Sequence, residues 1–301
     1  MKIEEARITL RPRTLSEVLD LALLVTTNGM AGMSARLGAT ALLPMYLAAL
    51  ALHYLAELSW MTVMLITWLY ASFVQGLFTV AIGQWLLSAE EPTVGSVLRE
   101  FRRHLGRWFG GWLWSRLLYT PIILWAVFVA GMDVPLVGAG ADADEAVGMI
   151  FLGMFCAMMG MPAHQSTLFL YEAVLLEQSR ASAAIKRSRQ FVRAVSSRSW
   201  SAALMLVTLW GAVLFLGDVV LRFIVEELLQ TGYVAAGSLG AGGSPYLAFG
   251  LLAAVPVLAV TRFLLYIDGR TRVDGWDVQV QFMALAAQNE QRRAGRAGGT
   301  A

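Results

Sequence analysis

Six long apolar segments constrain the fold of this chain more than any other feature of its sequence. They lie near 39–57, 59–87, 109–131, 147–176, 200–222 and 246–267. Each provides the roughly 20 predominantly apolar residues that a helix needs to cross the hydrocarbon core of a bilayer. With 57% hydrophobic residues and a mean hydropathy of +0.62, the chain also lies outside the usual composition of soluble domains. The sequence therefore predicts an all-α, polytopic membrane helix bundle with six transmembrane helices.

The distribution of basic residues predicts how this bundle is oriented. Lys and Arg cluster in four segments, which are 1–38, 89–108, 177–199 and 262–301. The loops at 132–146 and 229–245 contain none. Because basic loops remain in the cytoplasm, we expect both termini to be cytoplasmic and these two loops to be periplasmic, in the inner membrane of a bacterium. The first residues, MKIEEARITLRPRT, lack the features of a signal peptide, so we expect the N-terminus to be retained.

A basic amphipathic segment, AIKRSRQFVRAV at 184–195, follows the fourth apolar segment. On a helix its apolar face comprises Ala181, Ala184, Ile185, Ser188, Phe191, Val192 and Val195. The same pattern recurs in 93–108, where the apolar face comprises Val94, Val97, Leu98, Phe101, Leu105 and Trp108. It recurs again near 14–23, there with an acidic polar face. Each copy precedes two apolar segments, which predicts three helix–span–span repeats, about 14–88, 93–176 and 181–267, within one membrane domain over 1–273.

We expect the three amphipathic helices to lie along the cytoplasmic interface and to face anionic lipid headgroups or a partner with their basic side. The candidate contacts are Arg99, Arg102, Arg103, Lys186, Arg187, Arg189 and Arg193. A protein partner or a homo-oligomer is also possible on this surface, as is a purely topological role for the charges. Few aromatic residues lie on the polar faces, which argues against nucleic acid as a partner.

Three sequence blocks resemble those of a known family. They are RPRTLSEVLDLAL near the N-terminus, AVLLEQSRASAAIKRSRQFVRA at 173–194 and LLYIDGRTRVDGWDVQ at 264–279. They resemble a bacterial group of polytopic membrane proteins related to the membrane domain of some glycerophosphoryl diester phosphodiesterases. The matching residues are Glu177, Lys186, Arg187, Ser188, Arg193, Tyr266, Asp268, Arg270, Arg272, Gly275 and Asp277. The resemblance implies no reaction, because the diesterase activity belongs to a separate soluble domain whose His-Arg-Gly motif does not occur here.

Polar residues within the fourth apolar segment mark a candidate binding site. Pro162 predicts a kink or a break there, and His164 and Gln165 follow it near the bilayer midplane. Discontinuous helices at that depth are typical of transporter sites, with Gln75 as a possible contributor from the second segment. The alternative is a purely structural kink whose freed carbonyls are satisfied by neighbouring hydroxyls and helices.

Charged residues inside the apolar segments are expected to pair, because a lone charge in hydrocarbon is costly. Arg116 and Glu172 lie at similar depths on the third and fourth segments, which predicts an ion pair between them. Asp218 and Arg222 are four residues apart on the fifth segment and can pair within one helix. Both pairs are compatible with a structural role or with a role in transport.

Motifs for catalysis are absent from the sequence. It contains no HExxH, no Gly-x-Ser-x-Gly and no phosphate-binding Gly-rich loop, and its three histidines fall on separate elements. The one cysteine, Cys156, permits no internal disulfide. We therefore expect a non-enzymatic membrane protein without catalytic residues, metal or cofactor, acting as a scaffold, assembly partner or lipid-associated factor. A transporter or permease with its site around His164 and Gln165 is the alternative.

The C-terminal tail carries the last predictions. Asp274-Gly275 predicts a turn, because glycine adopts positive φ without steric cost. An amphipathic helix is expected over 274–288, with a short strand as the alternative, and 289–301 is expected to be disordered. We also expect Asp274 or Asp277 to meet arginines of the amphipathic helices.

Overall fold

The computed structural model describes residues 11–88, 91–125, 155, 158, 160–162, 164–177, 179–194, 196–230 and 243–275. Within these ranges the ordered elements are all helical. The α-helices are α1 (Leu15–Leu24), α2 (Ala31–Leu37), α3 (Leu43–Tyr54), α4 (Trp60–Leu87), α5 (Val94–Leu117), α8 (Leu170–Leu175), α9 (Ala181–Ala194), α10 (Ser196–Arg222) and α11 (Pro245–Asp274). The π-helical turns are η2 (Val25–Gly29), η3 (Gly38–Leu42) and η4 (Phe223–Leu228).

Four continuous helical stretches are long and apolar enough to cross a membrane. They are Ala31–Tyr54, Trp60–Leu87, Ser196–Leu228 and Pro245–Asp274, which correspond to the first, second, fifth and sixth apolar segments. The predicted all-helical class is confirmed for the described residues, and four of the six predicted transmembrane helices are present as helices of sufficient length and hydropathy. Much of the third and fourth segments, and the tail beyond Gly275 with Asp277 and 289–301, lie outside the described residues.

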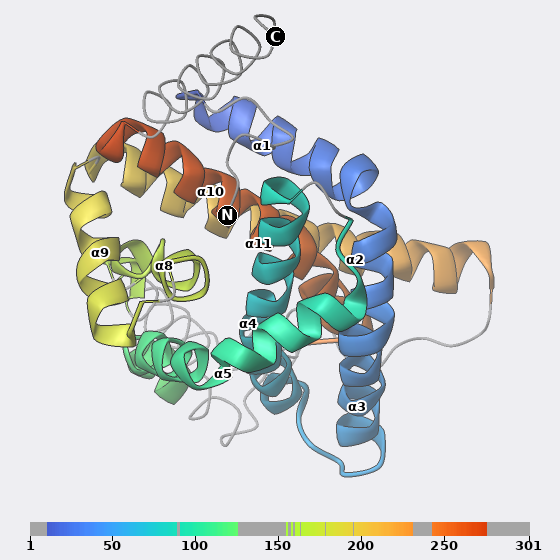
Figure 1. The fold of residues 1–301 in the computed structure, drawn as a ribbon. Helices are drawn as coiled ribbons and strands as arrows, with labels where there is room; N and C mark the ends of the chain where they lie inside the picture. The colour runs from blue at the N-terminus through green and yellow to red at the C-terminus, as the bar shows by residue number, and fades with distance from the viewer. Residues whose placement is uncertain are drawn as a thin grey trace, which may run out of the picture.

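Helix α11 lies at the centre of the bundle and packs against α10, α4 and α1 (Figure 1). Its side chains are buried along almost the whole helix, including Phe263 and Tyr266 at 0% and 1% exposure. It contacts α10 through glycines: a Cβ on Gly250 would lie 2.7 Å from the Leu214 carbonyl oxygen, and one on Gly217 would lie 2.6 Å from the Gly250 Cα. The lack of side chains at this crossing lets the two helix backbones touch.

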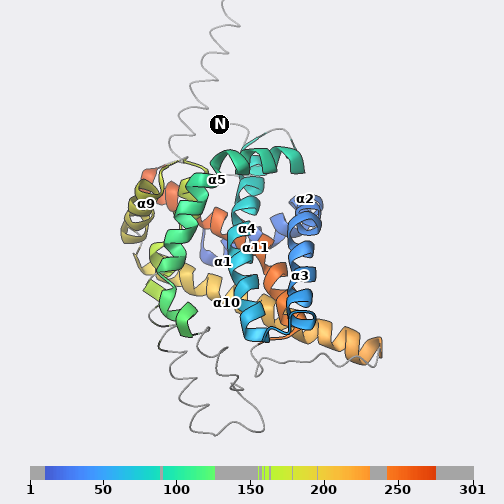
Figure 2. The ribbon, with the colours of Figure 1, turned by 90° about the horizontal axis from the view of Figure 1, so that it is seen from below.

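Figure 2 shows how the ends of the helices are distributed. The C-terminal ends of α4 and α11 lie with α9 at one end of the molecule. The turn at 55–59 between α3 and α4, and the start of α11, lie at the other end. The basic segment of α9 and the arginines that close α11 are therefore on the same side.

The amphipathic helices match the predicted phases with one correction. The buried residues of α1 are Val18 and Ala22, and those of α9 are Ala184, Ser188, Phe191 and Val192, as expected. Helix α5 buries Val97, His104, Trp108, Gly111 and Ser115, whereas Leu98 and Leu105 are 46% and 39% exposed. It also runs without interruption past Trp108, so the second amphipathic segment and the start of the third span form one helix. Its buried stripe is set by contacts with α4, α8 and α9, which rotate Leu98 and Leu105 outward.

The N-terminal end of α1 is held by a capping box. Thr14 Oγ1 accepts from the Glu17 amide at 3.2 Å, and the Glu17 carboxylate accepts from the Thr14 amide at 2.7 Å. This backbone hydrogen bond, together with the Arg11 guanidinium 2.8 Å away, lowers the pKa of Glu17 to about 2. The capping box thereby satisfies the amides of Thr14 and Glu17 at this helix end.

Candidate functional site

A cavity of about 350 Å³ lies between α4, α5, α10, α11 and the segment that precedes α8. Its position is close to the middle of the spans, because it is bordered by Gln75 of α4, Leu206 of α10 and Val255 of α11. The polar side chains that line it include Gln75, Arg116, Tyr119, His164, Tyr171 and Arg262. Such a concave, largely apolar space with a few convergent polar groups is typical of a small-molecule site.

Arg116 enters the cavity from the C-terminal end of α5. Its guanidinium carbon lies 4.6 Å from the centre of the Trp68 ring and 5.1 Å from that of Tyr119. One terminal nitrogen donates to the Tyr171 hydroxyl at 2.5 Å. Its Nε is buried and has no hydrogen-bond partner. Within the described residues no carboxylate lies within the 4.0 Å of an ion pair, and the contacts of the guanidinium there are two aromatic faces and one hydroxyl.

His164 faces the same space from the segment before α8. The Tyr119 hydroxyl lies 2.7 Å from its Nδ1, and its Nε2 is buried without a hydrogen-bond partner. Gln75, 8% exposed, lines the cavity from α4. The structure therefore brings together three of the predicted site residues, Gln75, Arg116 and His164.

Gln165 does not belong to this group. It is buried on the other side of the chain, where its Nε2 donates to Ser199 Oγ of α10 at 2.9 Å. Adjacent residues of a helix point about 100° apart, and here His164 lines the cavity whereas Gln165 does not. Gln165 is a packing residue at the junction of α10 with the segment before α8.

The predicted ion pair between Arg116 and Glu172 is wrong, because Glu172 pairs with a different arginine, Arg262. Glu172, at 0% exposure, lies 3.7 Å from Nε of Arg262 on α11. Both carboxylate oxygens are buried and lack hydrogen bonds. The neighbouring residue Tyr171 separates the two predicted partners, since its hydroxyl takes the hydrogen bond from Arg116.

Arg262 is the site residue that the sequence patterns missed. The distribution of basic residues places Arg262 in the basic segment 262–301. In the structure it lies 12 residues before Asp274, the last residue of α11, which is ~18 Å along the helix axis. Its Nη2 donates to the carbonyls of Leu168 at 2.9 Å and Thr167 at 3.4 Å, and its guanidinium stacks over Tyr171 at 4.1 Å. Its depth within an apolar helix was the signal that could have identified it.

The carbonyls that Arg262 binds belong to a break in the helix. The helical segment stops in a turn at 167–169 and restarts as α8 at Leu170, with Phe169 at φ −109° and ψ 12°. A break in this segment was predicted at Pro162, and the turn lies several residues after it. Ser188 of α9 donates to the Ser166 carbonyl at 2.9 Å and accepts from the Phe169 amide at 3.3 Å. The freed backbone groups are thus satisfied by Arg262 and Ser188, from two other helices.

A second polar cluster joins α9 to the end of α11. Glu177 accepts from the Tyr266 hydroxyl at 2.5 Å and lies 3.7 Å from Arg187 and 3.8 Å from Arg270. Asp274 pairs with Arg187 at 2.5 Å, which confirms the expected contact between the tail and an amphipathic helix. The predicted turn is confirmed by Gly275, whose φ is 59°.

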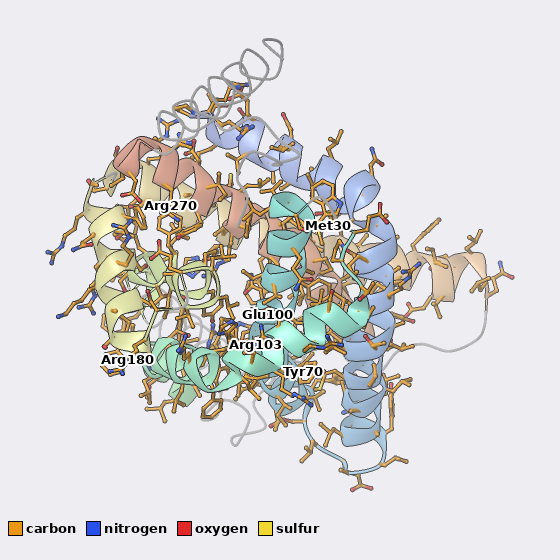
Figure 3. The ribbon with its side chains drawn as sticks, in the orientation of Figure 1. Met30, Tyr70, Glu100, Arg103, Arg180 and Arg270 are labelled. Carbon is orange, nitrogen blue, oxygen red and sulfur yellow. The ribbon has the colours of Figure 1, made fainter. Side chains whose placement is uncertain are left out.

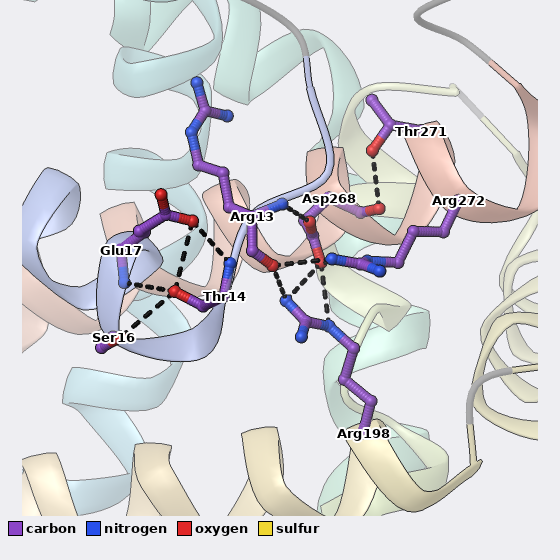
Figure 4. A network of polar contacts seen from close by, with 8 residues as sticks. All are labelled: Arg13, Thr14, Ser16, Glu17, Arg198, Asp268, Thr271 and Arg272. Carbon is purple, nitrogen blue, oxygen red and sulfur yellow. Dashed lines mark hydrogen bonds and ion pairs between the residues drawn. The ribbon is translucent and has the colours of Figure 1, made fainter.

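Asp268 holds three separate segments together (Figure 4). Its carboxylate, 3% exposed, accepts from the Arg13 amide at 2.7 Å, from Arg198 of α10 at 2.7 Å and from Arg272 at 3.1 Å. Arg272 also donates to the Arg13 carbonyl at 2.7 Å. Arg198 donates to the same carbonyl oxygen. Five residues of the matching blocks therefore make structural contacts in these two networks: Glu177, Arg187, Asp268, Arg270 and Arg272. A sixth, Ser188, bonds the helix break instead.

The other candidate contacts lie on the surface. Arg99, Arg102, Arg103, Lys186, Arg189 and Arg193 are exposed, and only Arg187 is half-buried. Arg103 forms a surface ion pair with Glu100 at 2.7 Å, and both residues are labelled on α5 in Figure 3. On α10, Arg222 lies 3.5 Å from Asp218, as predicted, and 3.2 Å from Glu226.

Metal coordination has no support in the described part of the chain, where no group of three or more His, Cys, Asp or Glu side chains converges. The polar groups that line the cavity are two guanidinium groups, several hydroxyls, one imidazole and the Gln75 amide. Comparisons with protein-family models, with curated proteins and with solved structures find no match.

Proposed function

We propose that the protein is a non-enzymatic membrane protein that binds a small molecule within the bilayer, as a transporter or permease does. The observation that carries this proposal is the cavity of about 350 Å³ at mid-span, into which Arg116 and His164 bring buried nitrogen atoms without hydrogen-bond partners. Polar groups at that depth require partners from within the protein or from a bound molecule.

The helix break beside the cavity supports the same proposal. Non-helical backbone at membrane depth is tolerated where it is buried in protein or borders a cavity. The turn at 167–169 meets both conditions, because its carbonyls bind Arg262 and Thr167 lines the cavity. Discontinuous helices of this kind accompany substrate sites in transporters.

We extend the proposal to the whole architecture: six spans in three helix–span–span repeats, in a bacterial inner membrane, with cytoplasmic termini and kinship to the diesterase-associated membrane domains. In support, α1, α5 and α9 all begin as amphipathic helices. Helix α9 and the C-terminal end of α11, both rich in arginine, also lie on one side of the bundle (Figure 2).

Cysteine accessibility tests whether the cavity is open to solutes. In a chain with Cys156 replaced by Ser, we expect Leu258→Cys, which faces the cavity, to react with a small methanethiosulfonate reagent. The matched control is Ala259→Cys, one residue further along α11, at 0% exposure and away from the cavity. The Leu258→Cys variant should react at least about tenfold faster, because thiolate formation requires access to water. Equal protection of both positions in lipid nanodiscs would contradict the proposal.

A lipid-associated or scaffolding role is the second candidate, favoured by the exposed basic side chains of α5 and α9. Exchange of Arg99, Arg102 and Arg103 for Gln tests it. The expected result is less anionic phospholipid, or less of a partner protein, retained through purification in mild detergent. Unchanged retention would remove the support for this role.

A further inference from the structure

We infer that the cavity takes an anionic amphiphile, with a carboxylate or phosphate group at Arg116 and His164 and an apolar body between α10 and α11. This inference rests on the proposed function and names the ligand class of the same site. It follows from the charge balance of the cavity, from the direction of its free donors and from the composition of its two sides.

The charge balance of the cavity favours an anion. Two guanidinium groups, those of Arg116 and Arg262, border the space. Arg262 has a counter-charge in Glu172 at 3.7 Å and donates to two backbone carbonyls, although its Nε, like that of Arg116, is buried without a hydrogen-bond partner. Arg116 is half-buried and meets no carboxylate in the described chain, and a charge removed from water without a counter-charge is costly. A ligand group with one negative charge beside Arg116 would neutralise this guanidinium.

The free donors converge on one wall. Arg116 Nε is buried without an acceptor, and guanidinium nitrogens bind carboxylate and phosphate oxygens in a bidentate manner. When the Tyr119 hydroxyl donates to Nδ1 of His164 across 2.7 Å, Nε2 carries the imidazole proton and is the second free donor. The guanidinium lies over the rings of both Trp68 and Tyr119, which are themselves in edge-to-face contact, so it is oriented before a ligand arrives.

The opposite wall is apolar. It consists of Leu206, Val207 and Trp210 of α10 with Leu251, Val255 and Leu258 of α11. Val207 is 40% exposed, so the cavity reaches the outer surface of α10, where an apolar side chain faces lipid. A small hydrophilic anion would leave this wall without a partner, whereas an alkyl chain gains roughly 25 cal/mol for each Å² that it buries. The volume of about 350 Å³ is small for a ligand pocket, which suits a medium-length chain.

The test uses the full chain in nanodiscs of zwitterionic phosphatidylcholine. The probe is a terminally brominated dodecanoate, because bromine quenches the fluorescence of tryptophans that it contacts, here Trp68 and Trp210. The matched probe is the brominated dodecanol, which has the same chain and no charge. We expect saturable quenching by the carboxylate at a concentration at least about tenfold lower than by the alcohol, a ratio worth about 1.4 kcal/mol. Trp210→Phe should remove part of the signal, and inorganic phosphate should not displace the carboxylate.

Variants then locate the anion. Arg116→Gln should abolish the preference for carboxylate over alcohol, and Arg116→Lys should restore part of it, because Lys keeps the charge without the bidentate geometry. Gln165→Ala is the control, since Gln165 lies one residue from His164 but binds Ser199 outside the cavity. It should leave the preference unchanged.

The other possible results would each contradict one part of the inference, or the proposed function itself. Equal binding of carboxylate and alcohol by the unmodified chain would refute the anionic part, and displacement by inorganic phosphate would refute the apolar part. The proposed function would survive either result. Absence of saturable quenching, with Leu258→Cys still reactive, would refute the inference alone, whereas absence of both would also refute the proposed function.

Discussion

Arg262 shows how one buried side chain can serve both the backbone and a carboxylate. It binds the carbonyls of Leu168 and Thr167, faces Glu172 and stacks on Tyr171, all from the interior of a spanning helix. Arg116, by contrast, is held by aromatic rings and a hydroxyl. The two arginines of the cavity therefore differ in role: Arg262 supports the helix break, and Arg116 remains available to a ligand.

Arg262→Met should strongly destabilise the protein. The substitution leaves the Glu172 carboxylate buried without a counter-charge, which typically costs about 3–5 kcal/mol. The loss is measured as the shift of the thermal inactivation midpoint in detergent. Adding Glu172→Gln should recover part of that loss, since the two effects are coupled through one contact. If the two substitutions shift the midpoint in a strictly additive way, the ion pair between Arg262 and Glu172 contributes nothing to stability.

At the N-terminus of α1, Glu17 predicts a pH dependence. Its pKa is lowered from 4.5 to about 2 in the folded chain, so its stabilising contribution is complete above pH 4.5 and is lost as the pH falls toward 2. Hydrogen exchange of the Thr14 amide, which donates to Glu17, should accelerate across this window beyond the intrinsic pH effect. Glu17→Gln should lack this added acceleration. If both chains behave alike, the carboxylate does not hold the cap.

At the scale of helices, α10 and α11 depend on the absence of side chains where they cross. Gly217 and Gly250 face each other so closely that a Cβ on either would lie under 3 Å from the backbone of the other helix. A backbone atom cannot move aside to relieve such a clash as the end of a flexible side chain can. The position of α10 beside the cavity depends on this contact, because Leu206 and Trp210 lie two turns or so before the crossing.

Gly250→Ala should destabilise the protein by about 1–3 kcal/mol through overpacking. Gly211→Ala on α10 is the control, because a Cβ there would meet nothing within 4 Å. That exchange should be neutral or stabilising by up to about 1 kcal/mol, as alanine favours the helix. Both are compared by thermal inactivation in the same detergent. Equal effects would show that the close crossing is not required.

On the scale of the whole molecule, Asp268 joins the residues before α1 to α10 and α11 (Figure 4). Arg13 and Arg198, which share this carboxylate, are 185 residues apart along the chain, and Arg13 and Asp268 are 255 residues apart. The network closes the bundle at the end where α9 and α11 meet.

Asp268→Asn should release the N-terminal segment. Two guanidinium groups would lose a buried counter-charge, with an expected cost of about 3–5 kcal/mol. Trypsin should then cleave after Arg13 faster than in the unmodified chain, as followed by mass spectrometry of the released peptide. The control is Asp274→Asn, whose carboxylate is 20% exposed and bonds only α9 and its own helix. Equal protection of Arg13 in both variants would contradict a docking role for Asp268.

The sequence alone determined the helical class, four of the spans now seen as long apolar helices, and the buried faces of α1 and α9. These are local properties, because segment length and the period of apolar residues do not depend on distant neighbours. Gln75, Arg116 and His164 were also identified, since a polar residue inside an apolar segment is visible without a structure.

Only the tertiary structure decided which polar groups meet. It paired Glu172 with Arg262 instead of Arg116, turned Gln165 toward Ser199 and brought Tyr119 to His164. It also rotated α5 so that Leu98 and Leu105 are exposed while His104 is buried. The physical reason is that the rotation of each helix about its axis, and the depth at which two helices cross, follow from packing between residues far apart in the chain.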